Sequence, residues 1–278
     1  MRYKSIALGI VLLALLSMVS LTLVAAQNQS AQGFVEGLLQ DILSSDGRRV
    51  LVEDVSISID GDVTAERIEV QDDTGTWLVM ETFSLDWQPL SLLSNSLQID
   101  SLSVERISVQ RLPATADTNS DAAPPAELSN LRDADIKKVS ISNLEVSEKV
   151  TGETFVFEVE GAGGVKQTPP EVRLDLKAQR TNGGDSRVTA SMLLDPLSRA
   201  LKLDFQLKEG KGGLVVNLLD IAGEPAVDLK ASAKGSIDDW QGRFGLNLDA
   251  SVAAKGTATV ATIDAGKRLT LEADGDIG

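Results

Sequence analysis

The sequence predicts a mostly β protein: an N-terminal transmembrane helix, a short amphipathic helix, and then a long curved antiparallel β-sheet that forms an open apolar groove. Apolar and polar residues alternate through most of the chain after residue 47, and no crossover helices separate the alternating segments. Such alternation is typical of strands with one apolar face, and strands without crossover helices pair mostly antiparallel. The 278 residues include only 6 Phe, 3 Trp and 1 Tyr, which disfavours a sandwich core packed with large rings.

The composition excludes several classes of function. The chain has no His and no Cys, so it lacks a Ser-His-Asp or Cys-His nucleophile, a histidine proton shuttle and a thiolate metal site. It has 26 Lys and Arg against 41 Asp and Glu, a formal net charge of −15, whereas nucleic acid binding needs a basic face. We therefore expect no enzyme activity, no cofactor or metal, and no nucleic acid partner.

The N-terminus predicts a membrane anchor over residues 1–26. Arg2 and Lys4 precede the apolar segment Ile6–Ala26, which as a helix is long enough to cross the roughly 30 Å of a bilayer core. A cleavable signal peptide is the alternative, but its apolar region is shorter, at roughly 7–15 residues. No further basic residue occurs before Arg48, so we expect the N-terminus to stay cytoplasmic and the rest to be exported. The anchor residues are Ile6, Leu12, Leu16 and Leu23.

Residues 27–46 predict a short amphipathic helix. Phe34, Leu38 and Ile42 recur every four residues, while Glu36 and Asp41 lie on the other face. The helix either packs against the end of the following sheet or lies on the membrane surface. Interfacial helices usually carry Lys or Arg on the polar face, so the acidic residues favour the packed position.

Two strand-rich segments follow, residues 47–112 and 131–278, with the loop 113–130 between them. This loop has two adjacent prolines and almost no large apolar residue, so we expect it to be disordered and exposed. The same strand pattern resumes at Ile136, which favours an insertion in a continuous sheet over a domain boundary. Within the second segment, a brief helical patch at Leu214–Leu219 interrupts the alternation.

A second periodicity occurs in two places. Apolar pairs recur every five residues in Leu97–Val109 and again in Ile136–Val146. Because side chains alternate between the two faces of a strand, each five-residue step should turn the apolar face over. A bulge or bend at every step would keep one face apolar and would curve the sheet. A turn between two separate strands and a parallel β-helix are the alternatives, and the spacing alone does not decide among the three.

A series of short motifs along the chain is distinctive: Gly75-Thr76-Trp77-Leu78, Leu85-x-Trp87-x-Pro89-Leu90-x-Leu92-Leu93, Leu97-x-Ile99-x-x-Leu102, Arg111-Leu112-Pro113, Gly223-Glu224-Pro225 and Gly235-Ser236-Ile237-Asp238-Asp239-Trp240-x-Gly242. Together with the N-terminal anchor, it closely resembles the TamB family, the inner-membrane subunits of the translocation and assembly module in Gram-negative bacteria. The resemblance covers nearly the whole chain, most loosely at residues 113–130. Because TamB proteins are far longer and this sequence stops inside strand-like sequence, we expect an N-terminal piece without the family's C-terminal domain.

The resemblance implies a curved β-sheet rolled into an apolar groove that bridges the periplasm. It implies phospholipid acyl chains as cargo, the outer-membrane barrel TamA as a partner of the missing C-terminal region, and a role in autotransporter assembly. The chain would be a single-pass protein of the cell inner membrane with its bulk in the periplasm. The expected groove-lining residues are Val55, Ile57, Ile59, Ile68, Val70, Leu97, Ile99, Leu102, Val104, Val139, Ile141, Leu174, Leu176, Leu203 and Phe205.

Two other functions stay open at this point. The chain would then be a scaffold or chaperone that guides outer-membrane β-proteins by strand pairing without lipid transport, or another AsmA-like envelope protein with the same anchor and groove. Lipid bound to the groove favours transport, whereas crosslinks to nascent barrel strands favour the scaffold. A full-length sequence with the TamB C-terminal domain would exclude the third possibility.

Overall fold

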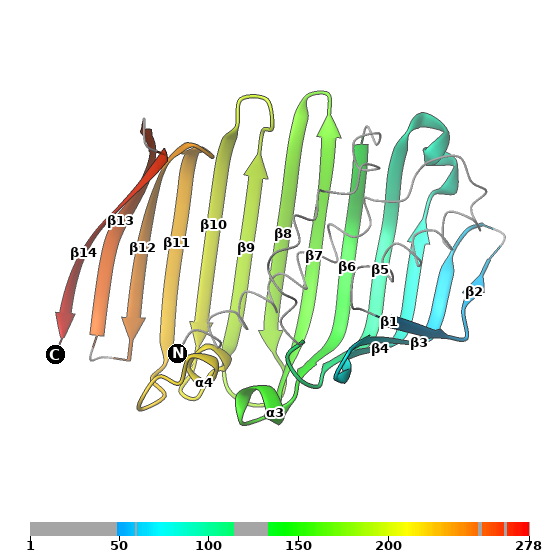
Figure 1. Ribbon diagram of the computed structural model, residues 1–278, viewed down its shortest axis with the longest axis horizontal. Coiled ribbons are helices and arrows are strands. Elements are labelled where there is room, and N and C mark those ends of the chain that lie inside the picture. The colour runs from blue at the N-terminus through cyan, green and yellow to red at the C-terminus, as the bar shows by residue number, and fades with distance from the viewer. Residues whose placement is uncertain (1–48, 59, 114–132, 250–251, 264–265, 278) are drawn as a thin grey trace. The chain divides into compact units, whose positions relative to one another are not determined.

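The computed structural model describes residues 49–58, 60–113, 133–249, 252–263 and 266–277, whose strands form one open, largely antiparallel sheet (Figure 1). The predicted anchor, the predicted helix over 27–46 and all but the first residue of the predicted loop 113–130 lie outside the described residues. The chain divides into two compact units, Met1–Val159 and Glu160–Gly278, which we call unit 1 and unit 2.

Strands dominate the described part of both units. The predicted helical patch at Leu214–Leu219 is confirmed as helix α4 with the same bounds. The strands are β1 (Arg49–Glu53), β2 (Ser56–Ile57), β3 (Val63–Asp72), β4 (Gly75–Trp87), β5 (Ser96–Val109), β6 (Asp133–Val146), β7 (Phe155–Gln167), β8 (Pro170–Arg180), β9 (Ser186–Leu194), β10 (Ala200–Glu209), β11 (Val227–Ser236), β12 (Asp239–Leu248), β13 (Val252–Ile263) and β14 (Gly266–Ile277), and the other helices are η1 (Pro89–Ser94) and α3 (Glu148–Thr151).

The strand order follows the sequence from β3 to β14, with β1 and β2 both paired to β3. Pairing is antiparallel from β3 to β5 and again from β8 to β14. One pair departs from the expected antiparallel sheet, because β5 and β6 run parallel with Ser96 opposite Asp133. Parallel neighbours need a crossover of a dozen or more residues, and the segment between Val109 and Asp133 is long enough to provide it.

The apolar residues of unit 1 form rows across β3, β4, β5 and β6. Leu102 of β5 lies opposite Leu85 of β4 and Val139 of β6, and Leu85 lies opposite Val63 of β3. Paired residues project to the same side of a sheet, so these rows share one apolar face. Its side chains are buried, with Ile99, Val104 and Ile141 each only 1% exposed.

The five-residue repeats lie on β5 and β6, side by side and in register, with Ile99 opposite Ile136 and Val104 opposite Ile141. Each strand continues for 14 residues, so the alternatives of a turn between separate strands and of a parallel β-helix are wrong. The register of β4 against β5 shifts at the first step, and Thr82 of β4, beside the second step, has a positive φ of 54°. Irregular residues at these steps keep the apolar side chains on one face of the sheet, as the alternative of a bulge or bend at each step predicts.

Residues of the distinctive motifs hold both ends of the strands in unit 1. At one end, Nε1 of Trp87 donates a hydrogen bond to the carbonyl oxygen of Gly61 at 2.7 Å. Gly61 has a φ of +98°, and a Cβ there would lie 2.3 Å from Pro89 Cγ, so only glycine fits. At the other end, Nη1 of Arg111 donates to Oδ2 of Asp72 at 2.9 Å. Trp87, Pro89 and Arg111 of these motifs therefore have structural roles in unit 1.

Replacing Ile141 by Ala tests the apolar face of unit 1. Ile141 is 1% exposed, so we expect the change to lower the free energy of unfolding by about 2–5 kcal/mol. The measurement is the urea dependence of tryptophan fluorescence, which reports on the buried Trp77 and Trp87. The neighbouring Ser140 pairs with Ser103 on the other face, so S140A serves as the control, and an equal loss in both variants would contradict the assignment of faces.

Candidate functional site

Unit 2 presents a continuous apolar face that runs from β8 to β14. Leu203 of β10 lies opposite Met192 of β9 and Ala233 of β11, and the same row continues through Gly242 and Ala258. The other rows have a similar composition, because each strand largely alternates apolar and polar residues, with exceptions such as Leu193 on the polar face of β9. This apolar face comprises Val172, Leu174, Leu176, Ala178, Val188, Ala190, Met192, Leu194, Leu201, Leu203, Phe205, Leu207, Val227, Leu229, Ala231, Ala233, Trp240, Gly242, Phe244, Leu246, Leu248, Val252, Ala254, Gly256, Ala258, Val260, Leu269, Leu271 and Ala273.

The two faces of unit 2 differ sharply in chemistry. On β10, Lys202, Asp204 and Lys208 alternate with the leucines and project to the opposite, polar face. Most side chains of the apolar face are only partly buried, and Leu269 and Leu271 are 66% and 63% exposed. Large exposed apolar areas are rare on soluble proteins and mark binding surfaces. The apolar face of unit 2 is therefore the candidate functional site.

Helix α4 covers one end of this face (Figure 1). Its Val216 is fully buried and forms a cluster with Leu207 of β10 and Val227 of β11, each 4% exposed. Phe205 and Leu246 are packed against the same cluster. The buried residues of α4 are Leu214, Val216 and Leu218, and through them this short helix covers the ends of the strands beneath it.

A buried carboxylate fixes the start of α4. Glu209 lies on the same side of β10 as Leu207 and is 3% exposed, and its Oε2 accepts a hydrogen bond from the backbone N–H of Val215 at 2.9 Å. Burial raises the pKa of the Glu209 carboxyl, while the backbone N–H groups of Val215 and Leu214 and the charge of Arg180 act in the opposite direction. The carboxylate supplies a partner to the helix end that has no side-chain cap of its own.

Aromatic rings lie close against glycines on β12 and β13. A Cβ at Gly256 would lie 2.7 Å from the ring of Phe244, its partner across the strands, and a Cβ at Gly242 would lie 3.0 Å from Cζ3 of Trp240. Glycine therefore leaves room for each ring to lie down along the sheet. The rings of Phe244 and Trp240 therefore project little from the apolar face.

The predicted groove-lining residues fall into two groups. Leu174, Leu176, Leu203 and Phe205 lie on the apolar face of unit 2 and are partly buried. Those of β3, β5 and β6 lie together on the buried apolar face of unit 1, namely Ile68, Val70, Leu97, Ile99, Leu102, Val104, Val139 and Ile141.

The remaining predicted residues lie near the start of unit 1. Val55 is 43% exposed between β1 and β2, and Ile57 of β2 pairs with Val63 of β3. Ile59 and the predicted anchor residues lie outside the described residues.

Several residues of the candidate site were missed by sequence reasoning. Val216 and Glu209 were missed because nothing in their local pattern shows that α4 folds back over β10. Gly242 and Gly256 occupy positions where the alternation predicts an apolar side chain. The signal that could have found Gly242 is Trp240 two positions earlier, and the signal for Gly256 is Phe244 on the neighbouring strand.

Comparison with known proteins identifies the family. The sequence model of the YdbH-like family, described as intermembrane phospholipid transport protein YdbH, matches residues 15–276. The chain belongs to the YdbH-like family. No curated protein sequence and no solved structure matches this YdbH-like chain.

The resemblance to TamB was therefore too specific. The match supports a YdbH-like chain, not specifically TamB, and it favours the alternative of another AsmA-like envelope protein. Two of the motifs that carried the resemblance contain residues that hold strand ends in unit 1, through the Trp87–Gly61 hydrogen bond and the Arg111–Asp72 pair.

Two further findings concern the described part of this YdbH-like chain alone. No helix within residues 49–58, 60–113, 133–249, 252–263 and 266–277 is long and apolar enough to cross a membrane. Among the same residues, no cluster of Asp or Glu has a geometry suited to a metal ion.

Replacing Glu209 by Gln tests the buried carboxylate through the pH dependence of stability. Folding raises the pKa of Glu209 above its ordinary value of 4.5. The free energy of unfolding therefore falls as the pH rises from 4.5 through the raised pKa of the folded state. Gln keeps an acceptor for Val215 N–H but does not titrate. We expect E209Q to raise the melting temperature at pH 8 and to flatten its fall between pH 4.5 and 8, and thermal melts at both pH values measure this.

The control for this prediction is E224Q, because Glu224 is exposed on the same connecting segment. It removes an exposed carboxyl in place of a buried one, so the difference between E209Q and E224Q measures the effect of burial. A lower melting temperature of E209Q at pH 8 would show that the charge itself stabilises α4.

Replacing Gly242 by Val tests the packing of the Trp240 ring. A Cβ at Gly242 would lie 3.0 Å from Cζ3 of Trp240, so we expect branched methyl groups to push the ring away from the sheet. Acrylamide quenching measures the effect, because Trp77 and Trp87 are buried at 8% and 2% exposure. Quenching should rise in G242V and stay unchanged in the control G245V, since a Cβ at Gly245 would contact nothing within 4 Å.

Proposed function

We propose that this YdbH-like protein transports phospholipids between the membranes of the cell envelope and that acyl chains travel along the apolar face of unit 2. The observation that supports this most is the partly exposed apolar face that continues in register across β8 to β14. Membership of a family described by intermembrane phospholipid transport supports the same cargo.

The apolar face meets the main energetic need of such transport. Moving a methylene group from an apolar surface into water costs about 0.8 kcal/mol, so an acyl chain of about fifteen methylenes needs protection on the order of 10 kcal/mol. The rows of leucine, valine and alanine side chains shield an acyl chain from water in a similar way on each strand. A cargo molecule that makes similar contacts on neighbouring strands can move across the sheet from strand to strand without a large barrier.

Low relief and chemical uniformity suit movement better than tight binding. The rings of Phe244 and Trp240 lie against Gly256 and Gly242, so they add apolar area without dividing the face into separate pockets. The charged side chains of the opposite face, such as Lys202 and Asp204, keep that side solvated. We therefore propose a conduit rather than a single lipid-binding pocket.

Unit 1 has a different part in this proposal. Its apolar side chains are more deeply buried, with Ile99 and Ile141 at 1% exposure, so they stabilise the sheet and leave little surface for cargo. We place the acyl-chain contacts on Leu174, Leu176, Leu203 and Phe205 of unit 2.

The position in the envelope is part of the proposal. Ile6–Ala26 would anchor the N-terminus in the inner membrane, with the sheet in the periplasm, in keeping with the charge asymmetry at Arg2 and Lys4. Partnership with TamA and autotransporter assembly came from the resemblance to TamB and have no support from the family match. The scaffold for outer-membrane β-proteins is the competing outcome of the experiment.

Site-specific photocrosslinking in cells tests the proposal. Benzoyl-phenylalanine replaces Phe205, which lies on the apolar face, or Gln206, which lies on the polar face of the same strand. In cells grown with radioactive phosphate, we expect a labelled phospholipid adduct at position 205 and none at 206, because only the first side chain would touch acyl chains. Mass spectrometry of the adduct identifies the lipid.

The two competing functions give different adducts. Protein adducts at position 205 without phospholipid would favour the scaffold for β-proteins. Equal phospholipid labelling at 205 and 206 would show contact with a bilayer rather than cargo on the apolar face.

A further inference from the structure

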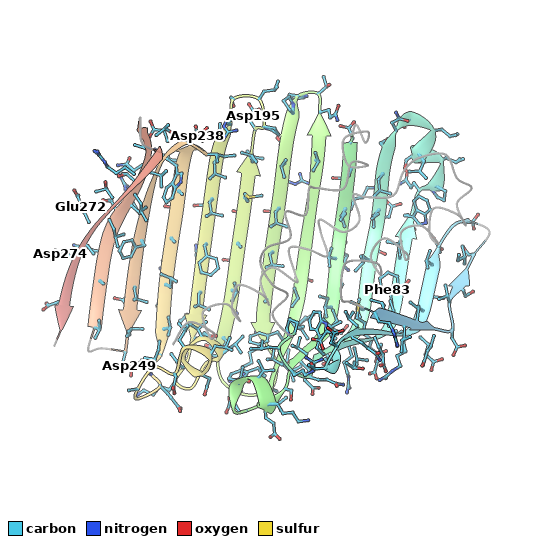
Figure 2. All side chains as sticks on the ribbon, in the orientation of Figure 1. Phe83, Asp195, Asp238, Asp249, Glu272 and Asp274 are labelled. Atoms are coloured by element: carbon cyan, nitrogen blue, oxygen red, sulfur yellow. The ribbon has the colours of Figure 1, made fainter. Side chains whose placement is uncertain are left out.

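The two ends of the strands in unit 2 are built differently. At one end, the 17-residue connection from β10 to β11 contains α4, between Glu209 and Val227. At the other end, β9 joins β10 through residues 195–199 and β11 joins β12 through residues 237–238. Figure 2 shows Asp195 and Asp238 at this second end and Asp249 at the first. Only the first connection is long enough to fold back over the apolar face.

The α4 connection is firmly attached to the strands around it. Backbone hydrogen bonds join Gly210 N to Asp185 O at 2.7 Å and Gly212 N to Glu224 O at 3.0 Å. Asp249 accepts a hydrogen bond from Ala226 N at 2.9 Å through Oδ1 and pairs with Nζ of Lys211 at 3.4 Å. With Val216 fully buried against Leu207 and Val227, α4 is a fixed cover for this end.

The short turns at the opposite end are attached to each other instead. Nε of Arg199 donates to Oδ2 of Asp238 at 2.6 Å, and Ile237 N donates to Arg199 O at 2.9 Å. Asp195 accepts hydrogen bonds from the backbone of Leu197 and Ser198 within its own turn. In the β9–β10 turn, Leu197 is 81% exposed, so this side chain does not cover the apolar face.

On β10 and β11, the burial of the apolar face follows this asymmetry. Leu207 and Val227, at the α4 end, are each 4% exposed. Leu194, Leu201 and Trp240, at the opposite end, are only partly buried. A polar headgroup placed at the α4 end would lose its water against buried leucine and valine side chains, which is costly for a charged phosphate. At the opposite end the headgroup keeps its hydration.

We propose that phospholipids on unit 2 lie with their headgroups at the β9–β10 and β11–β12 turns and their acyl chains pointing along the strands toward α4. This inference rests on the proposed function. The dimensions allow this arrangement: the 10 residues of β10 extend about 33 Å, roughly twice the length of one leaflet's acyl chains, which fill about half of the roughly 30 Å bilayer core. In this orientation, the side of the conduit at the β9–β10 and β11–β12 turns is open to water, and the side at α4 is covered.

Single-cysteine labelling tests the orientation, since the natural chain has no Cys. A fluorophore is attached to the full chain in nanodiscs at L197C, in the turn, or at L219C, on α4, where Leu219 is 37% exposed. The nanodiscs contain phosphatidylcholine with a nitroxide quencher on the headgroup or near the end of an acyl chain. K202C and K208C, on the polar face at the two ends of β10, report quenching by the bilayer itself.

We expect a crossed pattern after subtraction of the polar-face controls. The headgroup nitroxide should quench L197C several-fold more than L219C, and the acyl-end nitroxide should favour L219C. Stronger headgroup quenching at L219C, or equal headgroup quenching at both labels, would overturn the proposed orientation while lipid binding itself still stands. If neither nitroxide quenches L197C or L219C beyond the controls, the lipid does not occupy unit 2, and the proposed function fails together with the orientation.

Discussion

The pleat of the β-strand is the constraint on which the rest of the structure depends. Because consecutive side chains project to opposite faces, an unbroken alternation of apolar and polar residues gives a sheet with one apolar and one polar side. Registers such as Leu203 opposite Ala233 carry that division from strand to strand in unit 2. A second layer of the same chain normally buries such a face. Unit 2 has only α4 at one end, so its described residues leave much apolar surface for a cargo to cover.

The two units solve the same geometric problem differently. In unit 2, strands that largely alternate keep one apolar face without a shift of register between β8 and β14. In unit 1, β5 and β6 keep one apolar face despite a five-residue repeat, because irregular positions such as Thr82 return the side chains to the same side. The apolar face is deeply buried in unit 1 and partly exposed in unit 2. We connect the first with stability and the second with cargo.

Much of this fold could be predicted from the sequence, because the physical signals were local. Alternation identified most strands of unit 2, although not β13, and the loss of alternation identified α4 with the bounds Leu214–Leu219. The parallel pairing of β5 with β6 could not be predicted, since the direction of the strand after a loop depends on where that loop returns. The role of Glu209 was equally hidden, because a single carboxylate beside a glycine-rich turn has the pattern of an exposed residue. The lining residues of unit 2 remain proposals that rest on the face they share.

The in-register rows of unit 2 also determine how such a chain can change in length. Inserting one residue into a strand would turn its remaining apolar side chains to the wrong face unless an irregular residue returned them, as Thr82 does in unit 1. Removing β11 and β12 together would instead bring β10 beside β13, still antiparallel and with Leu203 and Ala258 in the same row. A hairpin is therefore the unit that can be added or removed without any such irregular residue. A protein built this way can match the distance that it must span in steps of two strands.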